Sequence, residues 1–179
     1  MPATATKIAP PQPGEYAEYY HKYIALVPQG EITGLLEKQG DEFAKFLESV
    51  ADADASIVHP PYGWTIKQVV SHIVDGDRIF TYRLLRIARG DKTPLPGFDE
   101  GEYAKTAGVE HLRLNDLVSE FQTVRAATIS LVRNLPSDAW LRTGTANGYP
   151  VSVRALAWVM VGHLQHHFAI IRKRLAAAR

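Results

Sequence analysis

The segment from Ser152 to Leu175 reads SVRALAWVMVGHLQHHFAIIRKRL and has the clearest helical pattern of the chain. Its apolar residues recur at three- and four-residue steps, at Leu156, Met160, Leu164, Phe168 and Ile171. The basic residues of its last turn, 172–174, suit the negative end of a helix dipole. The spacing predicts a helix over 152–175 that buries one face against other helices.

Three segments upstream repeat this pattern. Apolar residues fall at helical steps over 32–50, over 66–88 and over 114–135. The second of these segments begins with Thr65 as N-cap and Gln68 three residues later, which is the capping-box arrangement. Four amphipathic helices without a strong series of strands predict an all-α fold, a four-helix bundle.

Shorter segments complete the predicted fold. The aromatic stretch 14–27 predicts a short N-terminal helix, and Asn147-Gly148 predicts a small hairpin before the last helix. The long segment 91–110 predicts an irregular connection, a feature that often carries function. We expect a flexible arm over 1–13 and a single domain over 14–179.

Composition limits the function. The 179 residues include 20 Lys and Arg against 19 Asp and Glu, so a net charge of +1 gives no basic surface for nucleic acid. The absence of Cys excludes disulfides, thiolate-bound zinc and a thiol nucleophile. Neither a signal peptide nor an apolar run of about 20 residues is found. We expect a soluble cytoplasmic protein without a nucleic-acid or membrane partner.

The segment GHLQHH, 162–167, contains the most informative polar residues. His163 and His167 are four residues apart, so on a helix they share one face and can bind one ion. Both continue the apolar stripe, where two imidazoles are costly unless their nitrogens are satisfied. A metal would satisfy them, but a pair among seven histidines also arises by chance, so hydrogen-bonded histidines remain the alternative.

A third histidine strengthens the metal interpretation. His72 lies beside the apolar stripe of the helix over 66–88, and facing helices of a bundle often share a metal site. Three imidazoles would leave coordination positions open, which is the catalytic pattern of metal ligation. Asp75 is either a hydrogen-bond acceptor for a ligand imidazole or a solvated helix residue, and the role of Asp77 is open. We interpret His166 as a neighbour of the site rather than a ligand.

Three segments together resemble the DinB superfamily. They are GWTIKQVVSHIVD (63–75), GHLQHH (162–167) and the N-terminal stretch EYAEYYHKYIALVP (15–28). This superfamily of metal-binding four-helix bundles includes bacillithiol transferases and mycothiol-dependent maleylpyruvate isomerases. The middle of the chain, 91–151, resembles the family in its helical layout alone.

The resemblance implies that His72, His163 and His167 bind a divalent transition metal, either zinc, nickel, iron or manganese. It also implies a homodimer and an enzyme that activates a low-molecular-weight thiol, or water, for transfer to or hydrolysis of a small electrophile. A non-catalytic, metal-binding stress-response bundle is the alternative. The family name refers to DNA damage, but the charge balance argues against a DNA-binding protein.

Substrate specificity should come from residues around the open side of such a site. We expect these residues in the connection 91–110 and in the Asn147-Gly148 turn. Arg78, Arg83 and Arg142 are candidates to bind a substrate carboxylate, although arginines of this kind are usually solvated.

Overall fold

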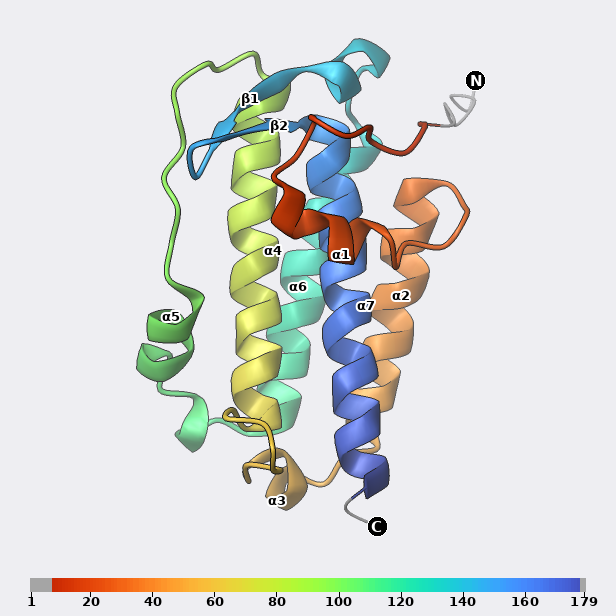
Figure 1. Ribbon diagram of the computed structural model, residues 1–179. Coiled ribbons are helices and arrows are strands. Elements are labelled where there is room, and N and C mark those ends of the chain that lie inside the picture. The colour runs from red at the N-terminus through yellow and green to blue at the C-terminus, as the bar shows by residue number, and fades with distance from the viewer. Residues whose placement is uncertain (1–7, 178–179) are drawn as a thin grey trace.

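The computed structural model describes residues 8–177, and four long helices dominate it (Figure 1). They are α2 (Ile32–Glu48), α4 (Ile66–Ala88), α6 (Leu114–Arg133) and α7 (Val153–Ala177). The predicted four-helix bundle is therefore confirmed. At the start of α4 the predicted capping box is present: Thr65 accepts from the Gln68 amide, and Gln68 accepts from the Thr65 amide.

The four helices form two parallel pairs. Helix α2 packs against α6 and α7, and α4 packs against the same two helices. Figure 1 shows that α4 and α6 run in one direction, whereas α2 and α7 run in the other. The chain must therefore return along the length of the bundle between α4 and α6, which explains the long connection predicted from the sequence.

That connection is less irregular than the sequence suggests. It runs along the outside of α4 and then forms helix α5 (Glu100–Thr106) and a 3-10 turn, η2 (Val109–His111). The Asp99 carboxylate caps α5 by accepting from the amides of Gly101 and Glu102. A second short helix, α3 (Asp52–Ala55), occupies part of the loop expected after α2.

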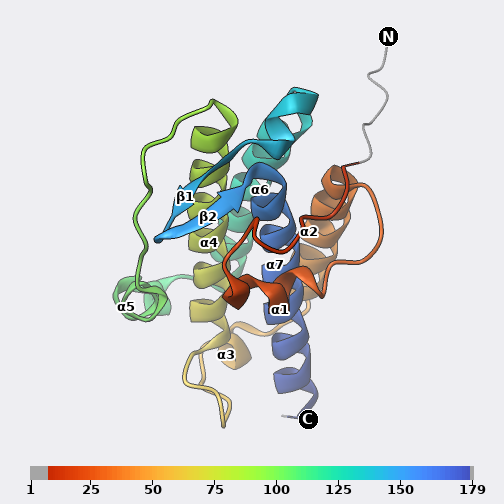
Figure 2. The same ribbon diagram turned by 45° about the horizontal axis from the view of Figure 1, so that its top comes forward.

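A small hairpin precedes α7, as predicted. Strands β1 (Thr143–Ala146) and β2 (Tyr149–Ser152) pair antiparallel, and Asn147 and Gly148 both have positive φ, at 52° and 79°, as a tight two-residue turn requires. A 3-10 turn, η3 (Ser137–Leu141), leads into the hairpin. Figure 2 shows the hairpin lying over the end of the bundle where α7 begins.

The hairpin also holds the connection in place. The Leu95 amide donates to the Thr145 carbonyl at 2.9 Å, and the Asn147 amide donates to the Leu95 carbonyl at 2.9 Å. These bonds tether the connection to β1 through an isolated parallel bridge.

The N-terminal segment crosses the face of α7 as η1 (Glu18–Tyr20) and α1 (His21–Ile24), which confirms the predicted short helix. Residues 1–7 of the predicted flexible arm lie outside the described residues. The segment passes so close to α7 that a Cβ added at Gly162 would overlap the Tyr23 carbonyl oxygen. Glycine at position 162 therefore permits the contact.

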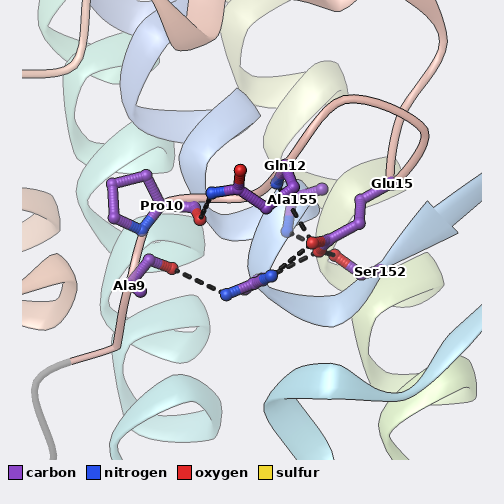
Figure 3. Close-up of polar contacts among 7 residues, drawn as sticks. Ala9, Pro10, Gln12, Glu15, Ser152 and Ala155 are labelled. Carbon is purple, nitrogen blue, oxygen red and sulfur yellow. Dashed lines mark hydrogen bonds and ion pairs between the residues drawn. The ribbon is translucent and has the colours of Figure 1, made fainter.

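A charged cluster fixes the start of this segment (Figure 3). The Glu15 carboxylate accepts from the Ser152 hydroxyl at 2.7 Å, from Arg154 Nε at 2.8 Å and from the Gln12 amide at 3.0 Å. The hydrogen bond from Arg154 is the main cause that lowers the Glu15 pKa to about 2. Glu15 is thus a carboxylate that ties the N-terminal segment to the first turn of α7.

The core consists of two apolar clusters with a buried polar layer between them. Each long helix contributes one residue to this layer: Gln39, Asp77, Arg125 and His163. Arg125 donates from Nε and Nη2 to both oxygens of Asp77, at 2.8 and 3.1 Å, and Gln39 donates to the Val161 carbonyl at 2.9 Å. Within residues 8–177, no helix combines the length and the apolar character needed to cross a bilayer.

Candidate metal centre

The structure brings together the three histidines that were expected to bind a metal. His72 projects from α4, and His163 and His167 project from α7 across the interface of these helices. Their candidate ligand nitrogens all lie within 4.8 Å of one another. Nε2 of His72 is 3.0 Å from Nε2 of His163, so these two ring nitrogens face each other directly.

All three rings are held in their neutral form. Burial lowers the pKa of His72, lowers that of His167 to about 3, and lowers that of His163 well below its usual range. The neighbouring histidines add to the shift at His163 and His167, because two positive imidazoles would repel each other. Neutral imidazole is the form that binds metal ions, so the cluster is ready to bind a cation near neutral pH.

The surroundings of one ring nitrogen, Nε2 of His167, indicate that a metal ion fits the cluster. Nε2 of His167 is buried and has no hydrogen-bond partner among residues 8–177. A buried polar atom without a partner is costly, and a bound cation would remove that cost. The donor set of three imidazoles suits several divalent transition metals and leaves coordination positions free.

Aromatic side chains and one glycine fix the orientation of the imidazoles. Tyr23 and Phe80 meet the His163 ring edge-on, with centroids 5.3 and 5.8 Å away, and Trp64 lies 5.2 Å from the His72 ring. A Cβ added at Gly76 would lie 3.1 Å from Cε1 of His163. The roles of Tyr23 and Gly76 were not predicted from the sequence, although a glycine in the middle of a long helix is a signal of close packing.

The neighbouring residues fall outside the ligand cluster. The Asp75 carboxylate lies 3.6 Å from Arg78 and, among the described residues, accepts no hydrogen bond from an imidazole, so Asp75 is part of a surface ion pair. Asp77 is fully buried but pairs with Arg125 in the polar layer. His166 is partly exposed and its ring lies 5.0 Å from the His167 ring, which agrees with its interpretation as a neighbour.

The remaining histidines are also outside the cluster. Nδ1 of His21 lies 3.3 Å from the Tyr16 hydroxyl, Nδ1 of His59 lies 3.3 Å from Arg174, and His111 is exposed.

A cavity of about 590 Å³ opens beside the three histidines. Its walls come from the N-terminal segment, α4, α7, the connection and the hairpin. Phe98 and Glu100 of the connection and Asn147 of the turn lie in its lining, within the segments expected at the open side of the site, and Tyr149 of the hairpin joins them. The imidazoles therefore face a space large enough for a small substrate.

Comparison with known proteins identifies the family of the chain. Residues 35–171, more than half of the chain, match the sequence model of the DinB superfamily. The chain belongs to the DinB superfamily. No curated protein matches the sequence.

Solved structures show the same DinB fold. The chain is similar to YfiT from Bacillus subtilis, described as a probable metal-dependent hydrolase with an unusual four-helix bundle topology. The TM-score is 0.72 at 18% identity, over 94% of this chain and 92% of YfiT. It is also similar to the mycothiol-dependent maleylpyruvate isomerase, with a TM-score of 0.67 at 19% identity, over 82% of this chain and 61% of the isomerase. A mutant of that isomerase gives the same TM-score.

Proposed function

We propose that this DinB protein is a metal-dependent enzyme that activates a low-molecular-weight thiol, or water, for attack on a small electrophile. His72, His163 and His167 would hold one divalent transition metal. The observation that carries the proposal is the position of three neutral, converging imidazoles in the wall of a substrate-sized cavity. A metal that merely stabilised the fold would not need such a cavity, because structural sites are closed by four protein ligands.

A divalent metal bound there would lower the pKa of a coordinated thiol or water toward neutrality. The chain has no Cys, so a reacting thiol would belong to the substrate. The similarity to a mycothiol-dependent isomerase supports the thiol route, and the similarity to YfiT supports the water route.

The chain itself would position the reactants and exclude solvent. Tyr23, Phe80 and Trp64 pack against the imidazoles and keep them in one orientation. Tyr23 remains a neutral phenol, since burial raises its pKa. Aromatic walls of this kind exclude bulk water from the reacting groups and strengthen polar interactions in the cavity.

Metal analysis of protein purified without a histidine tag tests the ligand set. After incubation with zinc, nickel, manganese or ferrous ions and desalting, elemental analysis should find about one ion per chain. His163→Ala should lose the ion, whereas the matched control His111→Ala, which changes an exposed histidine, should keep it. If His163→Ala retains the metal, the ligand assignment is wrong.

Turnover tests the enzymatic part of the proposal. Metal-loaded protein should consume a small electrophile, either with an added thiol or by hydrolysis, and chelation should stop the reaction. We expect His163→Ala to reduce the rate by about 100-fold or more, because the metal generates the nucleophile. A metal that raises the melting temperature without any turnover would favour the non-catalytic, metal-binding bundle instead.

A further inference from the structure

The three arginines that the sequence offered for substrate binding lie in different surroundings. Arg78 is half-exposed and pairs with Glu120 at 2.7 Å, and Arg142 pairs with Asp138 at 2.5 Å. Arg83 is 3% exposed and lines the cavity beside the histidines. Burial and position therefore separate Arg83 from the other two.

The Arg83 guanidinium has hydrogen-bonding capacity left over. Its Nη2 donates to the Pro96 carbonyl at 2.7 Å, and its Cζ lies 5.9 Å from the centre of the Phe98 ring. Within residues 8–177, no carboxylate forms an ion pair with it. Arg125, which is equally buried, has both oxygens of Asp77 as partners. A buried cation without a counterion is costly in free energy. An anionic group of a ligand bound in the cavity would pair with Arg83 and remove this cost.

Arg83 is the one cationic side chain among the described residues that line the cavity. Glu18 and Glu100 also line the cavity, and the charge of Glu100 contributes to raising the pKa of Tyr20, but both carboxylates are exposed, where water and salt weaken their charges. The buried charge in the lining is therefore that of Arg83, which favours a ligand with an anionic group.

Tyr20 supplies a second donor on the same wall. Burial raises its pKa, and the nearby positive charge of Arg83 partly opposes this shift, so the phenol is protonated at neutral pH. A guanidinium beside a phenol hydroxyl offers several N–H and O–H donors but a single positive charge. That combination matches a carboxylate, which carries one negative charge and two acceptor oxygens.

We propose that Arg83 binds a carboxylate of the substrate while the reacting end of that substrate lies at the three histidines. The inference rests on the proposed function and narrows its substrate class to carboxylate-bearing thiols or electrophiles. Arg83 would then be a specificity-determining residue, held in place by Pro96 and Phe98 of the connection.

Binding of matched thiols to cobalt(II)-loaded protein tests this assignment. The probes are 3-mercaptopropionate and 4-mercaptobutyrate, each compared with the uncharged mercaptoalcohol of the same length, and the thiolate-to-cobalt absorption band gives the Kd. We expect at least one acid to bind about 10-fold more tightly than its alcohol, as a charge-assisted pair predicts.

Arg83→Gln should abolish this preference, since glutamine keeps polar N–H donors but has no charge. Arg83→Lys should retain part of it, and Arg78→Gln, an exposed arginine of the same helix, should leave it unchanged. Circular dichroism verifies that each variant is folded. Equal binding of both acids and their alcohols to the native protein, or a preference that survives in Arg83→Gln, would overturn the role of Arg83 while the proposed function stands.

If no thiol changes the cobalt spectrum, the thiol route of the proposed function fails instead. Arg83 is then tested without metal, by the melting temperature of native protein with glutarate or with uncharged glutaramide. Glutarate, but not glutaramide, should raise the melting temperature of the native protein, and this increase should be absent in Arg83→Gln. The lack of any increase in the native protein would overturn the inference.

Discussion

His163 and His167 are stable inside the bundle only as neutral rings, because burial lowers the pKa of both imidazoles. The neutral state is what makes them ligands, and it also makes the metal-free protein sensitive to acid. Protons and a metal ion compete for the same nitrogen lone pairs. The charge state of two side chains therefore links metal binding to folding.

We predict that chelator-treated protein loses stability as the pH falls below about 6.5. The folded-state pKa of His167, about 3, lies below its usual value of 6.5, so between these values the unfolded chain binds a proton that the folded chain does not. The contribution of His167 to stability is constant above this window and is lost as the pH falls through it. By pH 5, His167 alone should cost about 1–2 kcal/mol.

Urea denaturation at pH 7.5 and pH 5 measures this loss. His167→Gln should show a weaker dependence on pH than the native chain. If the midpoints of the two proteins decline in parallel, the acid sensitivity has another origin.

Among the secondary-structure elements, the crossing of α1 over α7 depends on Gly162. We predict that Gly162→Ala destabilises the protein by about 1–3 kcal/mol, because the added methyl group would overlap the Tyr23 carbonyl oxygen. The matched control is Gly34→Ala in α2, where an added Cβ meets ordinary van der Waals contact with Glu31 at 3.5 Å. That change should be neutral or stabilising, since alanine favours helix more than glycine does.

Thermal unfolding of both alanine variants measures the two effects. Hydrogen exchange should also show faster exchange in residues 18–24 of the Gly162 variant than in the native chain. Equal stability of the two variants would mean that the crossing tolerates a side chain at position 162.

The elements with strong local signals were predictable from the sequence. Helix α4 has a capping box at Thr65 and an apolar stripe, and the hairpin has Asn147-Gly148 at its turn. Helix α5 escaped prediction because its seven residues have no apolar stripe, although Asp99 was a cap signal. The four-residue spacing of His163 and His167 was sufficient to predict that they share one face of a helix.

Other features depend on contacts between distant segments. The burial of Arg83 requires Pro96 and Phe98 of the connection to lie beside it, and no pattern around position 83 contains this information. Likewise, the close approach at Gly162 depends on where Tyr23 lies, 139 residues earlier. Local periodicity cannot place either neighbour.

For the whole molecule, the two parallel helix pairs set a minimum length for the connection. The 23 residues of α4 span about 34 Å, and residues 91–99 cover about 30 Å when extended. We predict that deleting residues 91–94 destabilises the bundle by at least about 3 kcal/mol, because the remaining chain is too short to reach the start of α6 without pulling α5 out of place.

Replacement of residues 91–94 by four Gly and Ser residues is the matched control. It removes the same side chains, including the ion pair of Arg86 with Asp91, but keeps the length. Circular dichroism melting of both variants measures the difference. If the deletion and the replacement are equally stable, the connection is longer than the fold requires.

The homodimer implied by the family resemblance stays a prediction. Light scattering, which gives the molar mass of the protein in solution, tests it.

The hydrogen bonds between Leu95 and the hairpin hold the rim of the cavity together independently of the helices that carry the candidate metal ligands. The candidate ligands are on the long helices α4 and α7, whereas much of the cavity rim is on loop residues joined to one another through backbone hydrogen bonds. The exposed side chains of this rim, Glu100 and Tyr149, can therefore be exchanged without disturbing either helix. A library restricted to positions 100 and 149 should diversify the accepted substrates while metal affinity remains constant, which makes the bundle a natural scaffold for evolving new selectivity.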